Sequence, residues 1–375
     1  MTPHGETGCS VVSLACPRIY RELRAAGRSV WMPDHRAWAL AHHRDVRDAL
    51  GAKGLSGAAD DLPVTGTPLC VEGAQYRGVR RALGSRLHRA ACRERAERIS
   101  ARAAQLTRRV ISSGVWDATV LGWRVSADTA LGLLGVPERD RDRVLDGQAS
   151  APEWQRGDLP VAAAFHRLIT SLPDSAISSD SWTGALRAAA ARGKLPSTAG
   201  RDLIGQLVLQ GADLGVHTIT TAVRLLSTHP DQWLLLRAHR THAGWVETAV
   251  HEALRYAPPV IAVRRTAREP LSYDGVRVPA GDRVLLLYGA AGRDPNQWGH
   301  SAAVYDIRRR AARDHLSLGG IRHTCSGLHL AVIHATAVLR TLAEQVSELR
   351  PAPGRVPYAR GMIRGWQCLP TSTTP

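Results

Sequence analysis

Helical spacing of apolar residues dominates the chain after residue 80. The stretch RRALGSRLHRAACRERAERISARAAQLTRRVI, residues 80–111, predicts consecutive helices, because its apolar side chains recur every three or four positions. RDLIGQLVLQGADLGVHTITTAVRLLSTHP, residues 201–230, predicts one long helix by the same spacing, closed by His229-Pro230. The pattern therefore indicates a mostly helical fold.

Strand signals are fewer and lie mainly in one region. LSYDGVRVPAGDRVLLLY, residues 271–288, alternates apolar and polar positions, with predicted turns at Asp274-Gly275 and at Pro279-Ala280-Gly281. The loop-like residues 171–186 separate two helical regions without a shift in composition, so they mark no domain boundary. We predict a mainly α fold with a small antiparallel β element, in a single domain over residues 1–375.

The composition is typical of a folded protein in a reducing compartment. With 375 residues, 44% of them hydrophobic, the chain can bury a large core. Its six cysteines form no CxxC pair, which argues against a disulfide framework and against structural zinc. The early apolar run VVSLAC, residues 11–16, is too short for a signal peptide or a membrane span. We expect a cytoplasmic protein without membrane contact.

Positive charge is the strongest bias in the composition. The formal net charge is +16, and Lys53 and Lys194 are the only lysines, so nearly all of the excess is arginine. The arginines are spread along the chain without a basic tail or a nucleic-acid-binding motif, which disfavours nucleic acid as a partner. Two interpretations stay open: a coding bias toward arginine, and a basic face that docks an acidic protein.

One cysteine stands in a setting that differs from the other five. HLSLGGIRHTCSGLHLAV, residues 315–332, places Cys325 in a glycine-rich turn directly before an apolar helical pattern. Glycines let backbone N–H groups approach the sulfur, and the N-terminal end of the following helix favours a thiolate. A thiolate at this position can take up a proton, form a disulfide or bind a metal.

Further motifs precede this turn. In VHEALRYAPPV, residues 250–260, Glu252 and Arg255 are three apart on a predicted helix that Pro258-Pro259 ends. An isolated ExxR pair is common in helices, so its weight comes from the motifs that follow it. These are, in chain order, RRTAREP, VPAGDRVLLLYGAAGRDPNQW, YDIRR and LGGIRHTCSG.

This order resembles that of the cytochrome P450 family in its bacterial soluble form, most specifically over residues 229–338. LGGIRHTCSG, residues 318–327, matches the family's haem loop, usually written FGxGxHxCxG. The resemblance implies a cytochrome P450 fold, haem b as cofactor, and Cys325 as the axial thiolate and the metal ligand. Such a thiolate pushes electron density into the iron and favours O–O cleavage.

The resemblance also assigns roles to other residues. Glu252 and Arg255 match the ExxR pair that braces the core behind the haem, which is a structural role. Arg265 matches an arginine that holds a haem propionate, with Arg264 as the weaker candidate. His323, two residues before the cysteine, matches a histidine that contacts a propionate.

Two more haem-edge positions lie upstream, and two positions in the haem loop depart from the family. In VEGAQYRGVRRAL, residues 71–83, Tyr76 and Arg80 stand where a histidine and an arginine bind propionate, and both side chains can make such bonds.

In the haem loop, Leu318 replaces an aromatic residue of the family and Ile321 replaces a glycine. Because a β-branched residue does not comfortably take positive φ, we expect the loop backbone to differ there.

The long helix departs further from the family, which carries an acid and an alcohol above the iron to relay protons to bound oxygen. Counting 16 residues back from His229 places Asp213 at the acid position. Gln210 then stands where a small residue is expected, and Leu214 at the alcohol position. These three are the candidate catalytic residues. Gln210 and Leu214 are four apart, so they would share one helical face.

A rival register, one helical turn later, aligns Gly215, His217 and Thr218 with the glycine, acid and alcohol. It restores a hydroxyl but requires a one-turn deletion before His229. Loss of a positioned proton donor costs roughly 10²–10⁴ in the rate of a step that needs it. Within the family, a missing donor fits enzymes that take hydrogen or electrons from an activated aromatic better than it fits hydroxylases.

We therefore predict an oxidoreductase that couples or dehydrogenates a small aromatic natural product, such as an aromatic cyclic dipeptide or peptide. The first alternative is a conventional monooxygenase that hydroxylates a secondary metabolite, and the second is a non-catalytic P450-like partner protein. The resemblance implies a ferredoxin-type redox partner, docked on an arginine-rich face. That face would include Arg322, Arg77 and Arg81. Substrate contacts are expected from residues 57–70, Trp154, Trp182, the long helix and residues 259–263.

Overall fold

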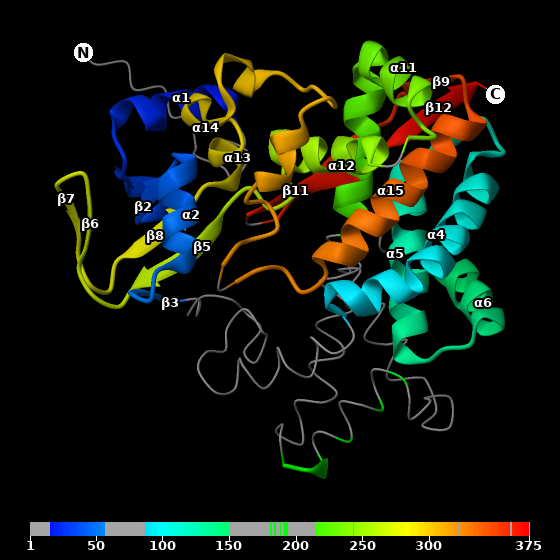
Figure 1. Cartoon of the computed structure of the whole chain (residues 1–375), viewed down its shortest axis with the longest axis horizontal. Coiled ribbons are helices and arrows are strands. Elements are labelled where there is room, and N and C mark those ends of the chain that lie inside the picture. Colours follow the sequence, from blue (N-terminus) through cyan, green and yellow to red (C-terminus); the bar gives the residue numbers. More distant parts are fainter. Residues whose placement is uncertain are drawn as a thin grey trace.

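Helices dominate the part of the chain that the computed structural model describes (Figure 1). The described residues are 16–56, 87–149, 181, 184, 188, 191–193, 215–242, 244–321, 323–360 and 362–374. The α-helices in these ranges are α1 (Pro17–Ala26), α2 (His43–Gly51), α4 (Arg89–Ile111), α5 (Ala118–Leu134), α6 (Glu138–Ala149), α11 (Pro230–Ala238), α12 (Trp245–Tyr256), α13 (Tyr288–Ala291), α14 (Pro295–Trp298), α15 (Leu328–Gln345) and residues 215–228. The 3-10 turns are η2 (Pro33–His35), η4 (His300–Ala303) and η5 (Arg310–Asp314).

The strands are short and form four small sheets in the described part of the chain. They are β1 (Val30–Met32), β2 (Ala37–Leu40), β3 (Leu55–Ser56), β4 (Val115–Asp117), β5 (Val263–Ala267), β6 (Leu271–Tyr273), β7 (Val276–Val278), β8 (Arg283–Leu286), β9 (Glu348–Pro351), β10 (Val356–Arg360), β11 (Ile363–Cys368) and β12 (Pro370–Thr374). The largest sheet has the order β1-β2-β8-β5-β3, and the others are β4-β12-β9, β10-β11 and β6-β7. The prediction of a mainly α fold with a small β component is confirmed.

The predicted antiparallel element over residues 271–288 is only partly right. β6 and β7 form the expected hairpin, with Asp274 and Gly275 at φ 53° and 80° in its turn. β8 does not pair with β7; it runs antiparallel to β5 and parallel to β2. The reason is burial: Val284, Leu285 and Leu286 are all fully buried, which suits a central strand better than the edge of a hairpin.

Local signals set several helix ends. Asp117 caps α5 by accepting a hydrogen bond from the Thr119 backbone N–H (2.7 Å), and Gly135 ends it at φ 94°. α11 begins with a proline in its first turn, where a missing N–H costs nothing. α12 ends at Tyr256, shortly before Pro258-Pro259, as predicted. None of the described helices combines the length and apolar character needed to cross a membrane.

The principal core cluster lies among the helices, with α15 packed along α4 and α12 (Figure 1). Two smaller clusters line the five-stranded sheet, beside α1 and α2. The segment that leads into α15 lies between the sheet and the helical part of the molecule (Figure 1). This segment carries Cys325.

The helix at residues 215–228 approaches α5 closely through two glycines. A Cβ on Gly122 would lie 3.1 Å from the Val216 Cα atom, and a Cβ on Gly215 would lie 2.4 Å from Ser126 Oγ. Side chains larger than glycine would therefore push the two helices apart. Gly215 has a packing role in this contact.

Candidate functional site

Cys325 is held at the start of α15. Its backbone N–H donates a hydrogen bond to the Leu318 carbonyl oxygen (2.8 Å), and the helix begins at Leu328 with Gly327 as its N-cap. The partial positive charge at this helix end favours a thiolate. A Cβ on Gly327 would lie 4.0 Å from the sulfur, which is an ordinary van der Waals distance. The sequence prediction of a cysteine directly before an apolar helix is confirmed.

Two of the described residues in the cysteine loop, residues 315–327, have left-handed backbone conformations. Gly319 has φ 73°, and a Cβ there would lie 2.2 Å from the His323 carbonyl oxygen. Ile321 has φ 49°. The expectation that the isoleucine would move the backbone away from positive φ is wrong, because hydrogen bonds such as His323 N–H to Gly320 O (3.0 Å) hold the loop. The isoleucine instead bears strain of about 1–3 kcal/mol.

The loop is tied to α12 through His315 and Ser317. The Ser317 hydroxyl donates to the Leu254 carbonyl oxygen (2.7 Å), and its backbone N–H donates to His315 Nδ1 (3.1 Å). His315 Nε2 lies 3.3 Å from His251 Nδ1 on α12. Burial lowers the pKa of His315 to about 3, and the nearby His251 and Arg255 lower it as well. His315 is therefore a neutral anchor at physiological pH.

The predicted ExxR pair is fully buried behind this loop. Arg255 donates from Nε and Nη2 to the two carboxylate oxygens of Glu252, each at 2.7 Å. The remaining guanidinium hydrogens go to backbone carbonyl oxygens of Gly292, Ala302 and Val304. The pair thus ties α12 to the segment at residues 292–304. Its charged groups are used in these internal bonds, so its role is structural.

Arg309 joins this brace and was missed by the sequence prediction. Its Nε lies 3.4 Å from Glu252 Oε2, and its Nη2 donates to the backbone oxygen and the hydroxyl of Ser301, both at 3.0 Å. Glu252 also accepts from the Asp306 backbone N–H (2.9 Å). The signal was present in the quoted YDIRR motif, but nothing in the motif distinguishes its two arginines.

Arg265 and Cys325 both lie in the electrostatic environment of Tyr288. Arg265 is buried on β5, and Tyr288 is buried at the start of α13. Burial raises the pKa of Tyr288 to about 12; Arg265 opposes this rise and Cys325 adds to it. Two residues 60 positions apart in the chain are therefore both within electrostatic range of Tyr288. His323, which is part-buried, lies in the same loop as the cysteine. Tyr288 carried no sequence signal of its own.

The rival residues of the long helix lie in its described part. His217 and Thr218 are both buried, each 3% exposed. The His217 ring lies against β11, because a Cβ on Gly365 would lie 2.0 Å from His217 Nδ1. Gly215 faces α5 instead, as described above. The helix and the β10-β11 hairpin thus meet at His217.

Several predicted residues lie outside the part of the chain that the structure describes. They are the haem-edge pair Tyr76 and Arg80, the catalytic candidates Gln210, Asp213 and Leu214, the basic residues Arg77, Arg81 and Arg322, the substrate-contact candidates Trp154 and Trp182, and residues 57–70.

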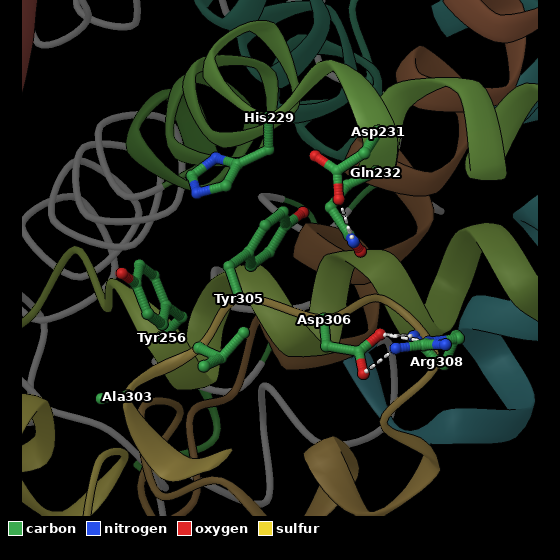
Figure 2. A pocket seen from close by; sticks show the side chains of 9 residues that line it. His229, Asp231, Gln232, Tyr256, Ala303, Tyr305, Asp306 and Arg308 are labelled. Atoms are coloured by element: carbon green, nitrogen blue, oxygen red, sulfur yellow. Dashed lines mark hydrogen bonds and ion pairs between the residues drawn. The ribbon is translucent and has the colours of Figure 1, made fainter.

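A pocket of about 470 Å³ is lined by residues outside the cysteine loop and is shown in Figure 2. Its lining residues are His229, Asp231, Gln232, Tyr256, Ala303, Val304, Tyr305, Asp306 and Arg308. The acids are already paired, Asp306 with Arg308 (2.8 Å) and Asp231 with the Gln232 amide (2.8 Å). None of the predicted site residues lines this pocket, so the cysteine loop remains the candidate site.

The donor set of the loop fits a haem. One part-buried cysteine before the N-terminus of α15 can supply a single thiolate ligand. The buried guanidinium of Arg265 is suited to a carboxylate such as a propionate. The fold and this site together define a mainly α protein of the haem-thiolate class.

Comparisons with known proteins agree with this class. The cytochrome P450 family model matches residues 238–342. Cytochrome P450 monooxygenase PikC of Streptomyces venezuelae is 33% identical over 262 residues, which are 67% of this chain and 61% of that protein. The chain spans between 39% and 61% of the lengths of the first curated relatives that it matches.

Solved structures extend the likeness over nearly the whole chain. P450BioI, in complex with an acyl carrier protein ligated to hexadec-9Z-enoic acid, has a TM-score of 0.81 at 22% identity, covering 96% of this chain and 99% of that one. P450 OxyD, involved in the biosynthesis of vancomycin-type antibiotics, has a TM-score of 0.79 at 26% identity, covering 95% of each chain. The chain belongs to the cytochrome P450 family, in its bacterial form, and the cofactor of that family is haem b.

Proposed function

We propose that the chain is a haem- and dioxygen-dependent oxidoreductase of the monooxygenase type, with Cys325 as the iron ligand. The observation that carries the proposal is the part-buried Cys325 sulfur in the loop before α15, inside the segment that matches the cytochrome P450 family model. Similarity to the monooxygenase PikC supports it. When bound, the haem supplies activation of dioxygen for oxidation of an organic substrate.

The chain's own residues would hold that group by charge and shape. Arg265 would bind one propionate by a bidentate contact, and His323 would donate a hydrogen bond to a propionate. Tyr76 and Arg80 are proposed for the same task on the strength of the sequence match. Glu252 and Arg255 hold α12 behind the loop and touch no reacting atom.

We propose oxidative coupling or dehydrogenation of a small aromatic natural product as the reaction. The sequence argument is the missing alcohol at Leu214, and similarity to OxyD, a P450 of antibiotic biosynthesis, supports a biosynthetic substrate. Hydroxylation of a secondary metabolite is the alternative, in line with the similarity to PikC. A non-catalytic role is disfavoured because the cysteine and its loop are intact.

The packing of Gly215 supports the register with Asp213 at the acid position. In the rival register Gly215 would be the glycine that makes room above the iron, yet this glycine is needed where it contacts Ser126 of α5. A role in helix packing accounts for it fully. Asp213, Gln210 and Leu214 therefore remain the proposed catalytic set.

We further propose that residues 1–375 form one domain, that the protein is cytoplasmic, and that a ferredoxin-type protein supplies its electrons. The scattered cysteines support a reducing compartment. The net charge of +16 supports an acidic electron donor, since opposite charge speeds encounter.

Replacing the proposed ligand tests the cofactor assignment. Cys325→Ser should abolish the carbon monoxide difference spectrum of a haem thiolate, because serine supplies no sulfur ligand. Cys92 is a matched control: it is buried in α4, and its thiol donates to the Leu87 carbonyl oxygen (3.5 Å). Cys92→Ser should leave the spectrum intact. Equal loss with both variants would contradict the assignment.

Two substitutions test the reaction type. For a coupling enzyme, Leu214→Thr should change the yield of coupled product little and add some hydroxylated product. Thr218→Val should leave the product unchanged. For a hydroxylase that uses Thr218, Thr218→Val should slow product formation by roughly 10²–10⁴ and raise hydrogen peroxide release. Product distribution and peroxide release on aromatic peptides measure the difference. A large loss confined to Thr218→Val would establish the rival register.

A further inference from the structure

The pocket in Figure 2 differs in charge from the chain as a whole. The formal net charge of the chain is +16, yet Asp231 and Asp306 line this pocket with Arg308 as the only cationic side chain among the lining arginines and lysines. Arg308 is used by Asp306, to which its Nε and Nη2 donate at 2.8 and 3.0 Å. Asp231 accepts a hydrogen bond from the Gln232 amide, which lowers its pKa, but it pairs with no lysine or arginine of the described chain. One negative charge in the pocket is therefore left without a cation.

A buried hydroxyl group belongs to the same pocket. Tyr305 is 3% exposed, and its hydroxyl has no hydrogen-bond partner among the described residues. Figure 2 shows the hydroxyl end of the ring directed toward Asp231 and Gln232. A buried polar group without a partner is unfavourable. A ligand that forms a hydrogen bond with this oxygen would remove that cost.

His229 supplies a further acceptor. Its Nδ1 lies 2.8 Å from the Leu225 carbonyl oxygen, which can only accept, so Nδ1 carries the hydrogen and Nε2 of the neutral ring is an acceptor. The pocket thus offers acceptors from Asp231, Tyr305 and His229. Its cationic donor Arg308 is already paired. This set suits a positively charged group that carries several N–H donors.

Aromatic rings line the pocket and restrict where a cation can lie. The Tyr305 ring contacts the rings of Tyr256 and His229, with centroid distances of 5.7 and 5.2 Å. The Tyr256 ring already holds a cation, because the guanidinium carbon of Arg293 lies 3.7 Å from its centroid. Arg293 opposes a second positive charge beside Tyr256. The position for a cation is therefore near Asp231, and the position for an uncharged aromatic body is near Tyr256.

We propose that this pocket binds a small aromatic amine in its ammonium form. Asp231, the Tyr305 oxygen and His229 hold the ammonium, and the Tyr256 ring contacts the aromatic body. A primary ammonium has three N–H donors, which matches the three acceptors. A volume of about 470 Å³ lies in the usual range for small-molecule sites. The site contains no residue of the cysteine loop, so the inference goes beyond the proposed function.

Calorimetric titration of the holoprotein with 2-phenylethylamine tests this site. The haem is kept reduced and bound to carbon monoxide, so the amine cannot bind the iron. The matched probe is 2-phenylethanol, which has the same ring and chain length but no charge. The amine should bind roughly tenfold more tightly than the alcohol, because hydrogen bonds from a charged donor are the stronger ones. Equal affinity for the two probes would overturn the inference.

Three variants assign the binding to this pocket. Asp231→Asn should weaken amine binding roughly tenfold, because it removes the charge and keeps the shape. Tyr305→Phe should weaken it roughly threefold without lowering the melting temperature, since no hydrogen bond within the described chain is lost. Asp140→Asn is the matched control: Asp140 also lies in the first turn of its helix, α6, and lies outside the pocket, so the affinity should not change.

Three results would contradict the assignment. Wild-type affinity in Asp231→Asn would overturn it, as would equal weakening by Asp140→Asn. An absence of saturable amine binding would also overturn it and would leave water as the partner of the Tyr305 hydroxyl.

Discussion

Two adjacent arginines in the YDIRR motif have opposite environments. The Arg309 side chain is 13% exposed and lies against the fully buried carboxylate of Glu252. The Arg308 side chain is 66% exposed and pairs with Asp306 at the surface, as Figure 2 shows. A buried charge that loses its partner costs far more than a surface pair does. At the residue scale, burial therefore decides which of the two arginines contributes to the stability of the fold.

This contrast gives a stability prediction. Arg309→Ala should lower the free energy of unfolding by about 3 kcal/mol, because it removes an ion pair with Glu252 and three hydrogen bonds to Ser301 and Trp298. Arg308→Ala should leave the free energy of unfolding unchanged. Urea denaturation of the two variants measures the difference. Equal destabilisation by both would show that Arg309 is not part of the brace.

At the scale of elements, α15 joins the site to the helical core. It begins directly after the cysteine loop and packs along α4, with further contacts to α5 and α12. Across the contact with α5, the buried His334 of α15 lies 2.8 Å from the Thr129 hydroxyl through its Nε2 atom. Burial lowers the pKa of His334 to about 4, so the ring is neutral in the folded protein at physiological pH.

His334 should make the protein sensitive to acid. In the unfolded chain a histidine titrates near pH 6.5, whereas His334 in the folded chain resists protonation down to about pH 4. As the pH falls through this window, the unfolded state binds a proton that the folded state does not, so folding stability is lost. The contribution is about 3 kcal/mol.

Denaturation of wild type and His334→Gln from pH 7 to pH 4 measures this contribution. Glutamine keeps a hydrogen-bonding side chain near Thr129 but does not titrate, so the variant should lose less stability over the window. His315 titrates in both proteins and cancels in the comparison, since its lowered pKa is common to them. Parallel pH profiles for the two proteins would contradict the assignment to His334.

At the scale of the whole molecule, the candidate site is assembled from distant parts of the chain. Arg265 comes from the five-stranded sheet and Cys325 from the loop before α15. Figure 1 shows the cysteine loop between the sheet and the helices. The whole-chain likeness to P450 structures reflects this arrangement, while the matched family model is confined to residues 238–342.

Features that depend on a few neighbouring residues could be predicted from the sequence. The helical content, the end of α12 before two prolines, the turn at Asp274-Gly275 and the helix start after Cys325 all follow from local spacing and backbone preference. The buried Glu252–Arg255 pair also follows, because both partners lie on one helix turn.

Features that depend on contacts between distant segments could not be predicted from the sequence. β8 pairs with β5 and β2 rather than with its sequence neighbour, and Arg309 rather than Arg308 reaches Glu252. Ile321 keeps positive φ against its own preference, because the hydrogen bonds of the surrounding loop outweigh the strain of one residue. Local preferences are worth about 1 kcal/mol per residue, and long-range burial and pairing override them when the chain folds.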